Sequence, residues 1–599
     1  AGQGFYHFRS APMKSFKPSK FASPLFVKKP WALQTRKSMS SQSSGGHAKT
    51  QSSSRVASWK PTNLSNKKLE FATCDPDSLG VGASAKVHNI IQGEWIQGAE
   101  DACEVIPDPL NGQPIIEVSE VKQESLNAFV RSLNSCPKYG MHNPLLNVDR
   151  YLLYGEISLK AANMLKDPDV EYFFARLIQR VSPKSYAQAR GEVVVTRKFL
   201  ENFSGDQVRF LARSFSTPGD HSGQQSQGYR WPYGPVALIT PFNFPLEIPV
   251  LQTMGALYMG NRPLLKVDSK VSIVMEQFIR LLHMCGMPMG DLDLINCHGS
   301  MMQTLLEKAK PRTTLFTGSS KVANILAERL EGRVKVESAG FGWKVLGPDV
   351  PSDPNAIDYV AHVCDQDAFA SSGQKCSAQS ILFVHKNWSK TGLLEKLEHL
   401  ASQRRLDDLT VGPTLSVTTE RFMSHVEGLK RIPGARVLFG GVEINDGQHK
   451  IPRQYGAMRP TAVFVPLSSL MAKKEHLELA TTEIFAPFQV VTEFEDGDIP
   501  AVLDVLEFVQ NHLTAAIVSN DVAFQRLFQG RSVNGTTYVG LRARTTGAPQ
   551  NHWFGPAGDP RAAGIGTREA IHVTWSCHRE FIQDNDISFV NSWKLPPRT

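Results

Sequence analysis

Short apolar segments alternate with longer amphipathic ones in the middle of this chain, and this order constrains the fold more than any other feature. The apolar segments predict β-strands at residues 235–240, 264–267, 292–296 and 314–317. Helical periodicity follows three of them, through residue 256 and over 271–284 and 322–330. Such alternation predicts an α/β fold in which a parallel sheet has helices on both faces.

The remaining chain must form further domains, because 599 residues exceed what a single hydrophobic core usually organises. Helical periodicity is also present over residues 125–133 and 170–181. The branched run 193–196 predicts a short strand, and the segment 214–231 predicts an extended or looped structure. Prolines and a glutamate interrupt the most apolar run, 235–260, so we do not expect it to span a membrane.

The net charge of +8 comes from the first seventy residues and not from the body of the chain. Thirteen of the 65 basic residues precede Glu70, which is the first acidic residue. The other 52 basic residues are set against 57 acidic ones, which gives a net charge of −5. The overall charge therefore gives no support to nucleic-acid binding by the folded part.

Residues 1–69 are rich in Ser, Lys and Arg and contain low-complexity stretches. This composition is typical of an organelle transit peptide, with the mitochondrial matrix favoured over the plastid; a disordered basic arm is the alternative. The eight cysteines are scattered without a C-x-x-C pair, which predicts neither a disulfide framework nor a metal site. A reducing compartment is therefore expected.

Cys376, in the string Gly373-Gln-Lys-Cys-Ser-Ala378, is the candidate nucleophile. Gly373 and the polar neighbours predict a tight, accessible loop, whereas a lone cysteine is more often a buried structural residue. A thiolate that attacks an aldehyde gives a thiohemiacetal. Loss of a hydride then gives a thioester, which water hydrolyses.

Two further side chains could complete this chemistry. Asn243 follows a predicted strand in a proline-flanked turn, where its amide could donate to an oxyanion together with the Cys376 N–H. Glu337 ends a short alternating segment and could take the proton of a hydrolytic water. The alternatives are a turn asparagine that satisfies its own backbone and a solvated glutamate at a strand end.

The segments 241–245, 316–319, 369–378 and 483–485, in this order and with these gaps, resemble the aldehyde dehydrogenase superfamily. The Cys376 string is similar to its Δ1-pyrroline-5-carboxylate dehydrogenase subgroup, whose plant members carry a mitochondrial presequence. The resemblance implies NAD-dependent oxidation of L-glutamate γ-semialdehyde to L-glutamate in proline breakdown. It assigns Cys376 as nucleophile, Glu337 as general base and Asn243 to the oxyanion site. After Glu337 the chain departs from the family, with Ser-Ala-Gly in place of Leu-Gly-Gly.

The resemblance also implies a distributed cofactor site, since the chain has no G-x-G-x-x-G string. The residues that match the family's NAD contacts are Phe242, Lys266, Ser269, Gly318, Ser319, Glu483 and Phe485. Ser319 begins a predicted helix whose amides could bind a pyrophosphate, and an ordinary N-capped helix is the alternative. NAD-preferring members often carry glutamate where this chain has Ser269, so the choice between NAD and NADP stays open.

For the substrate, the resemblance implies a clamp on the amino-acid end of the aldehyde. Lys375 and Ser377 match the subgroup's polar residues beside the nucleophile, and Gly547 and Ala548 match a second loop that is one residue shorter here. Phe554 could wall the apolar middle of the substrate or simply fill core. A generic polar loop is the alternative for Lys375 and Ser377.

The implied fold has a Rossmann-like cofactor domain (70–212 and 233–339), an α/β catalytic domain (340–569) and a β oligomerisation arm (213–232 and 570–599). An arm of this kind exposes sheet edges and predicts a homo-oligomer. Two rival hypotheses remain. One is a dehydrogenase for another aldehyde, such as succinate semialdehyde. The other is a catalytically silent protein that binds a cofactor or associates with RNA.

Overall fold

The computed structural model describes residues 67–97, 103–338, 340–547 and 552–599, and these residues belong to one compact unit. The predicted transit peptide therefore lies outside the described residues, except for the 3₁₀ helix η1 (Lys67–Leu69). Leu69 is buried in the core and Lys68 pairs with Asp167, so the folded part begins before residue 70. None of the helices in these ranges has the length and apolar character needed to cross a membrane.

A seven-stranded sheet organises the residues up to 338, in the order β12-β11-β8-β9-β10-β2-β3. Its strands are β2 (Asn89–Ile91), β3 (Glu94–Ile96), β8 (Pro235–Thr240), β9 (Arg262–Val267), β10 (Asp293–Leu294), β11 (Thr313–Gly318) and β12 (Val334–Ser338). The five strands from β12 to β10 are mutually parallel, while β2 and β3 are antiparallel to their neighbours. The four strands predicted between residues 235 and 317 and the parallel α/β sheet are confirmed.

Helices cover both faces of this sheet because its central strands are apolar on both sides. Along β8, Val236 and Leu238 pack in one core cluster and Ala237 packs in the other. The helices of this part are α1 (Gln123–Asn134), α2 (Asp149–Met164), α3 (Pro168–Val181), α4 (Tyr186–Asn202), α5 (Glu247–Tyr258), α6 (Ser272–Met284), α7 (Gly299–Ala309) and α8 (Ser320–Arg329).

The strand predicted at residues 193–196 is wrong, because this run lies inside α4. Ser185 caps that helix by accepting a hydrogen bond from the Gln188 N–H. Its buried positions include Ala189, Val193 and Thr196, which recur with helical spacing. Over seventeen residues this periodicity outweighs the β-propensity of four branched ones.

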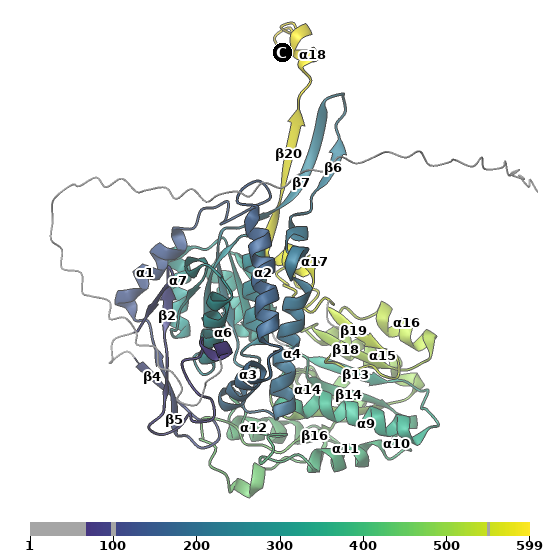
Figure 1. Cartoon of the computed structure of the whole chain (residues 1–599). Coiled ribbons are helices and arrows are strands. Elements are labelled where there is room, and N and C mark those ends of the chain that lie inside the picture. The colour runs from purple at the N-terminus through teal and green to yellow at the C-terminus, as the bar shows by residue number, and fades with distance from the viewer. Residues whose placement is uncertain (1–66, 98–102, 339, 548–551) are drawn as a thin grey trace, which may run out of the picture. The chain divides into compact units, whose positions relative to one another are not determined.

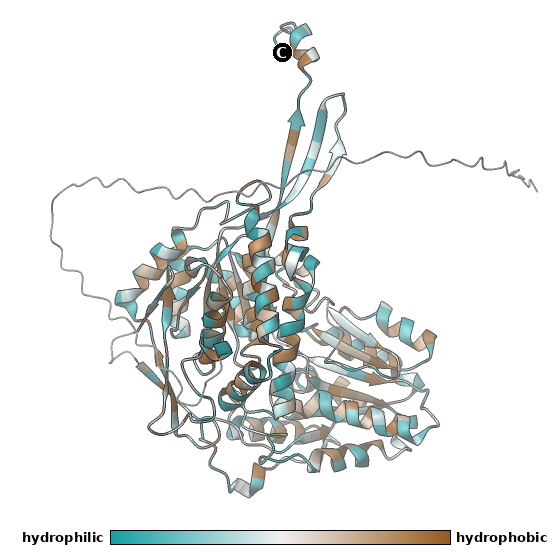
Figure 2. Cartoon of the chain, viewed as in Figure 1, coloured by the Kyte–Doolittle hydropathy of each residue, from teal (hydrophilic) through white to brown (hydrophobic). Residues whose placement is uncertain are grey.

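A second seven-stranded sheet, in the order β15-β16-β17-β14-β13-β18-β19, organises residues 342–539. Its strands are β13 (Gly342–Leu346), β14 (Gln379–His385), β15 (Arg436–Phe439), β16 (Thr461–Phe464), β17 (Phe488–Phe494), β18 (Thr514–Val518) and β19 (Thr536–Val539). The helices are α9 (Pro354–Phe369), α10 (Lys386–Ser389), α11 (Leu393–Ser402), α12 (Thr419–Lys430), α13 (Leu467–Met471), α14 (Lys474–Ala480), α15 (Ile499–Phe508) and α16 (Val522–Gly530). Only β15 is antiparallel, and Figure 2 shows hydrophobic residues along the inner strands.

Two small sheets complete the described chain. β1 (Ala85–Val87), β5 (Pro114–Ser119) and β4 (Cys103–Pro107) form one, beside the first large sheet. β6 (Phe215–Pro218), β7 (Gln224–Pro232) and β20 (Ser576–Asp584) form an arm that extends away from the large sheets (Figure 1).

The segment 214–231 is extended as predicted, but the strand expected from residue 570 begins only at Ser576. Residues before it form α17 (Arg568–Trp575), which Thr567 caps by accepting from the Ala570 N–H, and α18 (Ile587–Ser592) follows the arm.

Candidate active site

The loop that carries Cys376 follows the 3₁₀ helix η6 (Ala370–Gly373) and is held in a strained conformation. Ser371 and Ser372 have φ angles of 55° and 54°, in a region that costs non-glycine residues about 1–3 kcal/mol. Gln188 of α4 stabilises this turn, because its Oε1 accepts from the Ser371 N–H at 3.1 Å and from the hydroxyl at 3.2 Å. This strained turn fixes the direction in which the backbone approaches Cys376.

Two glycines allow other backbone segments to approach this loop closely. A Cβ on Gly340 would lie 1.5 Å from the carbonyl oxygen of Cys376. Gly373 has a φ of +66°, and a Cβ there would lie 2.0 Å from the carbonyl oxygen of Ala486. Gly340 therefore has a steric reason to be kept even though the residues before it depart from the family pattern.

Asn243 lies in the turn after β8 and contacts the loop that carries Cys376. Its Nδ2 donates to the carbonyl oxygen of Gln374 at 3.2 Å, two residues before Cys376. An amide group has two N–H donors, so this contact leaves the second N–H available. The side chain is 3% exposed, which keeps it in one position.

Glu337, on β12, is buried, and its carboxylate interacts with the Cys376 thiol. Burial raises its pKa to about 7. Burial also raises the pKa of the Cys376 thiol, and the neighbouring Glu337 carboxylate raises it further. A weakly acidic thiol beside a carboxyl that titrates near neutrality is an arrangement suited to proton transfer.

Two cavities meet at Cys376 and Glu337. One of about 360 Å³ reaches toward the carboxyl ends of β8 and β11. Residues predicted for the cofactor line it: Phe242, Gly318, Ser319, Glu483 and Phe485. The other cavity, of about 380 Å³, extends on the far side of the thiol.

The first cavity fits a dinucleotide at three points. Ser319 precedes α8 without capping it through its side chain, so the first-turn amides can receive an anion. Phe242 and Phe485 meet edge to face with ring centroids 5.9 Å apart and form an apolar wall. Glu483, whose pKa burial raises to about 8, offers a carboxylate whose Oε1 accepts from the Gly340 N–H at 3.1 Å.

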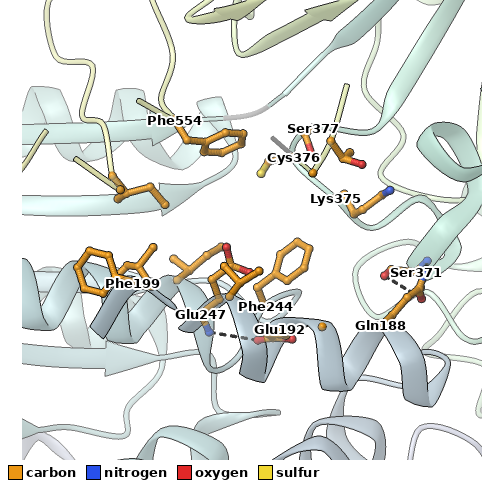
Figure 3. Close-up of a pocket in the computed structure, with 18 of the residues that line it drawn as sticks. Gln188, Glu192, Phe199, Phe244, Glu247, Ser371, Lys375, Cys376, Ser377 and Phe554 are labelled. Carbon is orange, nitrogen blue, oxygen red and sulfur yellow. Dashed lines mark hydrogen bonds between the residues drawn. The ribbon is translucent and has the colours of Figure 1, made fainter. Parts of the chain in front are cut away.

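The second cavity is lined by aromatic rings and closed by a buried cation. Figure 3 shows Cys376 and Phe554 on one side of it and Phe199 and Phe244 on the other. Lys375 is 8% exposed and donates to the carbonyl oxygen of Gln366 at 3.0 Å. Burial lowers its pKa to about 8.

The loop with Gly547 closes the same cavity, together with Lys375 and Ser377. Asp367 holds this loop, because its carboxylate accepts from the Thr545 N–H at 2.7 Å and from the Thr546 hydroxyl at 3.2 Å. The buried Lys344 Nζ pairs with the same carboxylate at 2.8 Å.

Two of the predicted site residues lie outside both cavities. Lys266 and Ser269 line neither cavity and lie at the carboxyl end of β9, which is the parallel neighbour of β8. Ala548 is outside the described residues.

Sequence reasoning missed residues of α4, of α5 and of the turn before α5 that line the same cavity as Cys376. Gln188, Glu192, Phe244 and Glu247 all line the second cavity (Figure 3). Glu192 Oε1 accepts from the Leu246 and Glu247 N–H groups, and Figure 3 shows the latter contact. Phe244 could have been predicted to line the cavity, because it follows Asn243 directly. No sequence signal relates α4 to Cys376.

Known proteins resemble this chain in sequence and in fold. The model of the aldehyde dehydrogenase family matches residues 95–576. The mitochondrial Δ1-pyrroline-5-carboxylate dehydrogenase 12A1 of Arabidopsis thaliana is 60% identical over 548 residues, which cover 92% of this chain and 97% of that protein. A Linum usitatissimum protein named "Probable aldehyde dehydrogenase" is 61% identical over 532 residues, 89% of this chain and 95% of that protein.

Solved structures share the fold. The NAD-dependent aldehyde dehydrogenase from Sinorhizobium meliloti matches with a TM-score of 0.71 and 17% identity. The match covers 90% of this chain and 100% of that one. At this identity the likeness concerns the fold alone.

Proposed function

Since this chain belongs to the aldehyde dehydrogenase family, we propose that it oxidises L-glutamate γ-semialdehyde to L-glutamate with NAD. The observation that carries the proposal is the meeting of two cavities at Cys376 and Glu337, one with a buried lysine at its wall. The substrate is the open form of the compound in the name of the Arabidopsis relative.

Cys376 attacks the aldehyde carbon, and its thiol proton passes to Glu337. The developing oxyanion accepts from the free N–H of Asn243 Nδ2 and from the backbone N–H of Cys376. One such donor is typically worth about 2.7–4 kcal/mol in the transition state. Because Asn243 is fixed by its contact with Gln374, this donor needs no rearrangement when charge develops.

Bound NAD would supply the hydride acceptor for oxidation of the thiohemiacetal carbon. Ser319 and the start of α8 would hold its pyrophosphate, and Glu483 would accept from ribose hydroxyls beside the wall of Phe242 and Phe485. Gly318 leaves the approach to that helix free of a side chain.

Hydrolysis of the resulting thioester requires a base on the same side as the sulfur. Glu337 takes the proton from the attacking water, and a pKa of about 7 leaves a useful fraction of it ionised near neutrality. Glu337 therefore serves twice, first for the thiol and then, after it has released that proton to solvent, for water.

The amino-acid end of the substrate sets the specificity. Lys375 uses one of its three N–H donors on Gln366, so two remain for the α-carboxylate. Ser377 and the backbone at Gly547 add donors, and Phe554 covers the methylene carbons. This polar end of the cavity supports an amino-acid aldehyde over a simple one.

We also propose the location and the assembly of the protein. The mitochondrial name of the Arabidopsis relative and the basic segment 1–69 support import into the mitochondrial matrix. β6 and β20 are the outer strands of the arm, and Phe215 and Ile582 on them are 56% and 71% exposed. Such edges support a homo-oligomer in which a second copy covers the arm. The domain boundaries predicted above stay part of this proposal.

The experiment is a steady-state assay of the purified full chain at 340 nm with NAD. Glutamate γ-semialdehyde, succinate semialdehyde and propanal are compared by kcat/KM. We expect glutamate γ-semialdehyde to lead. A lead by succinate semialdehyde would support the rival dehydrogenase, and a complete lack of turnover would support the silent cofactor-binding protein.

A further inference from the structure

The carboxyl end of β9 presents a hydroxyl that is bound to a buried carboxylate from elsewhere in the chain. The Ser269 Oγ donates to Glu120 Oε1 at 3.0 Å, across 149 residues of sequence. Glu120 follows β5 and is only 8% exposed. Its Oε2 has no hydrogen-bond partner among the described residues.

The surroundings of Glu120 contain charges of both signs. His298 Nε2 lies 3.9 Å from Oε2, and burial together with Glu120 raises the pKa of the nearby Glu104. Burial raises the pKa of the Cys297 thiol. The Lys266 ammonium lowers this pKa and the Glu120 carboxylate raises it, so both charged groups lie near Cys297. Asp268 is committed elsewhere, because it accepts from the Lys270 N–H at 3.0 Å and pairs with that side chain at 3.4 Å.

The position of this carboxylate follows from the sheet. β8 and β9 are adjacent and parallel, so their carboxyl ends open on the same edge. The residues after β8 line the cofactor cavity, and in doubly wound α/β folds a dinucleotide lies across such an edge. An acidic residue at the end of the second strand then accepts from the 2′-hydroxyl of the adenosine ribose. Here that strand end carries Ser269, whose hydroxyl donates to Glu120.

We propose that Glu120 is the residue that selects NAD over NADP, by accepting from the adenosine 2′-hydroxyl and repelling a 2′-phosphate. The inference rests on the cofactor use proposed above. Without this carboxylate, Lys266 would face one carboxylate fewer, because Asp268 is paired with Lys270 and only Glu104 remains, so a 2′-phosphate would meet less repulsion. Glu120, which follows β5, thus supplies the negative charge that Ser269 lacks.

The test is a binding measurement that needs no turnover. Isothermal calorimetry of the full chain compares 5′-AMP with adenosine 2′,5′-bisphosphate, which differ only in the 2′-phosphate. We expect the unmodified protein to bind 5′-AMP roughly tenfold to a hundredfold more tightly. Equal affinities in the unmodified protein would overturn the proposal before any variant is made. The solutions contain EDTA, because ligand atoms of Glu104, Glu120 and His298 lie within 4.8 Å of one another and could hold a cation.

In Glu120→Gln the preference should shrink by about tenfold or reverse, since repulsion is lost while the shape is kept. Glu124→Gln removes the same charge from an exposed position four residues away and should leave the ratio unchanged. Glu120→Asp should keep the preference, and it tests the charge if Glu120→Gln does not fold. The NADP-to-NAD ratio of kcat/KM should follow the binding ratio.

The outcomes separate the two proposals. If NAD binds and the ratio is the same in Glu120→Gln as in Glu124→Gln, this inference fails and the proposed function stands. If neither NAD nor NADP binds the unmodified protein, the proposed cofactor use itself fails.

Discussion

The buried Lys184 Nζ donates to the carbonyl oxygen of Asn243 at 2.7 Å. The same ammonium pairs with Glu192 Oε2 at 3.1 Å and lies 4.8 Å from the ring centroid of Phe244. Glu192 in turn accepts from the first N–H groups of α5. One ion pair thus fixes the backbone of Asn243 and the start of the helix that follows it.

Lys184→Met should destabilise the protein and slow the reaction. Glu192 would be left as an unpaired buried charge, which typically costs about 3–5 kcal/mol of unfolding free energy. Displacement of Asn243 should lower kcat by roughly tenfold or more. Urea unfolding and steady-state kinetics measure the two effects.

The double variant Lys184→Met/Glu192→Gln separates stability from positioning, because the uncharged Gln can still accept from the α5 amides. Stability should largely return while kcat stays low. Full recovery of kcat in the double variant would show that Lys184 does not position Asn243.

Cys376→Ala should abolish aldehyde oxidation and leave NAD affinity nearly intact. The thiol lies where the two cavities meet, and the predicted cofactor contacts, such as Glu483, do not depend on it. Fluorescence titration with NAD measures the affinity, and the assay at 340 nm measures turnover. Ordinary turnover in this variant would remove the mechanism.

The alternation of apolar and amphipathic segments was enough to predict the parallel sheet, and the strand at 235–240 has the predicted bounds. The strand prediction failed at Val193 and at residues 570–575. The β-branched residues there lie inside helices, whose caps and longer periodicity decide the structure. The motif around Cys376 was enough to predict a nucleophile there, and that role stays a prediction. The support that Gln188 gives to its loop could not be predicted, because it depends on how α4 packs in three dimensions.

Glu337→Gln should lower kcat by about 10²–10⁴, the usual loss when a general base is removed. In the unmodified protein, Glu337 acts as a base only when ionised, and burial places its pKa at about 7. The profile of kcat/KM should therefore rise as the pH rises through about 7, and the variant should lack this limb. A limb that persists in Glu337→Gln would assign it to another group, such as Glu247.

Ser377→Ala should raise KM for glutamate γ-semialdehyde by roughly tenfold, the effect of one lost hydrogen bond to a charged group. Propanal has no carboxylate, so its KM should change little. Equal effects on both substrates would mean that Ser377 does not contact the amino-acid end.

Lys375 should impose an upper pH limit that depends on the substrate. Burial lowers its pKa to about 8, so it is a cation below that pH and loses its charge as the pH rises through it. KM for glutarate semialdehyde, a carboxylate substrate without an amino group that could cyclise, should rise above about pH 8. KM for propanal should not, because nothing in propanal pairs with an ammonium. In Lys375→Met the KM for glutarate semialdehyde should be high at every pH. If the upper limit also appears with propanal, the group that titrates acts on the chemistry at Cys376 and not on the substrate carboxylate.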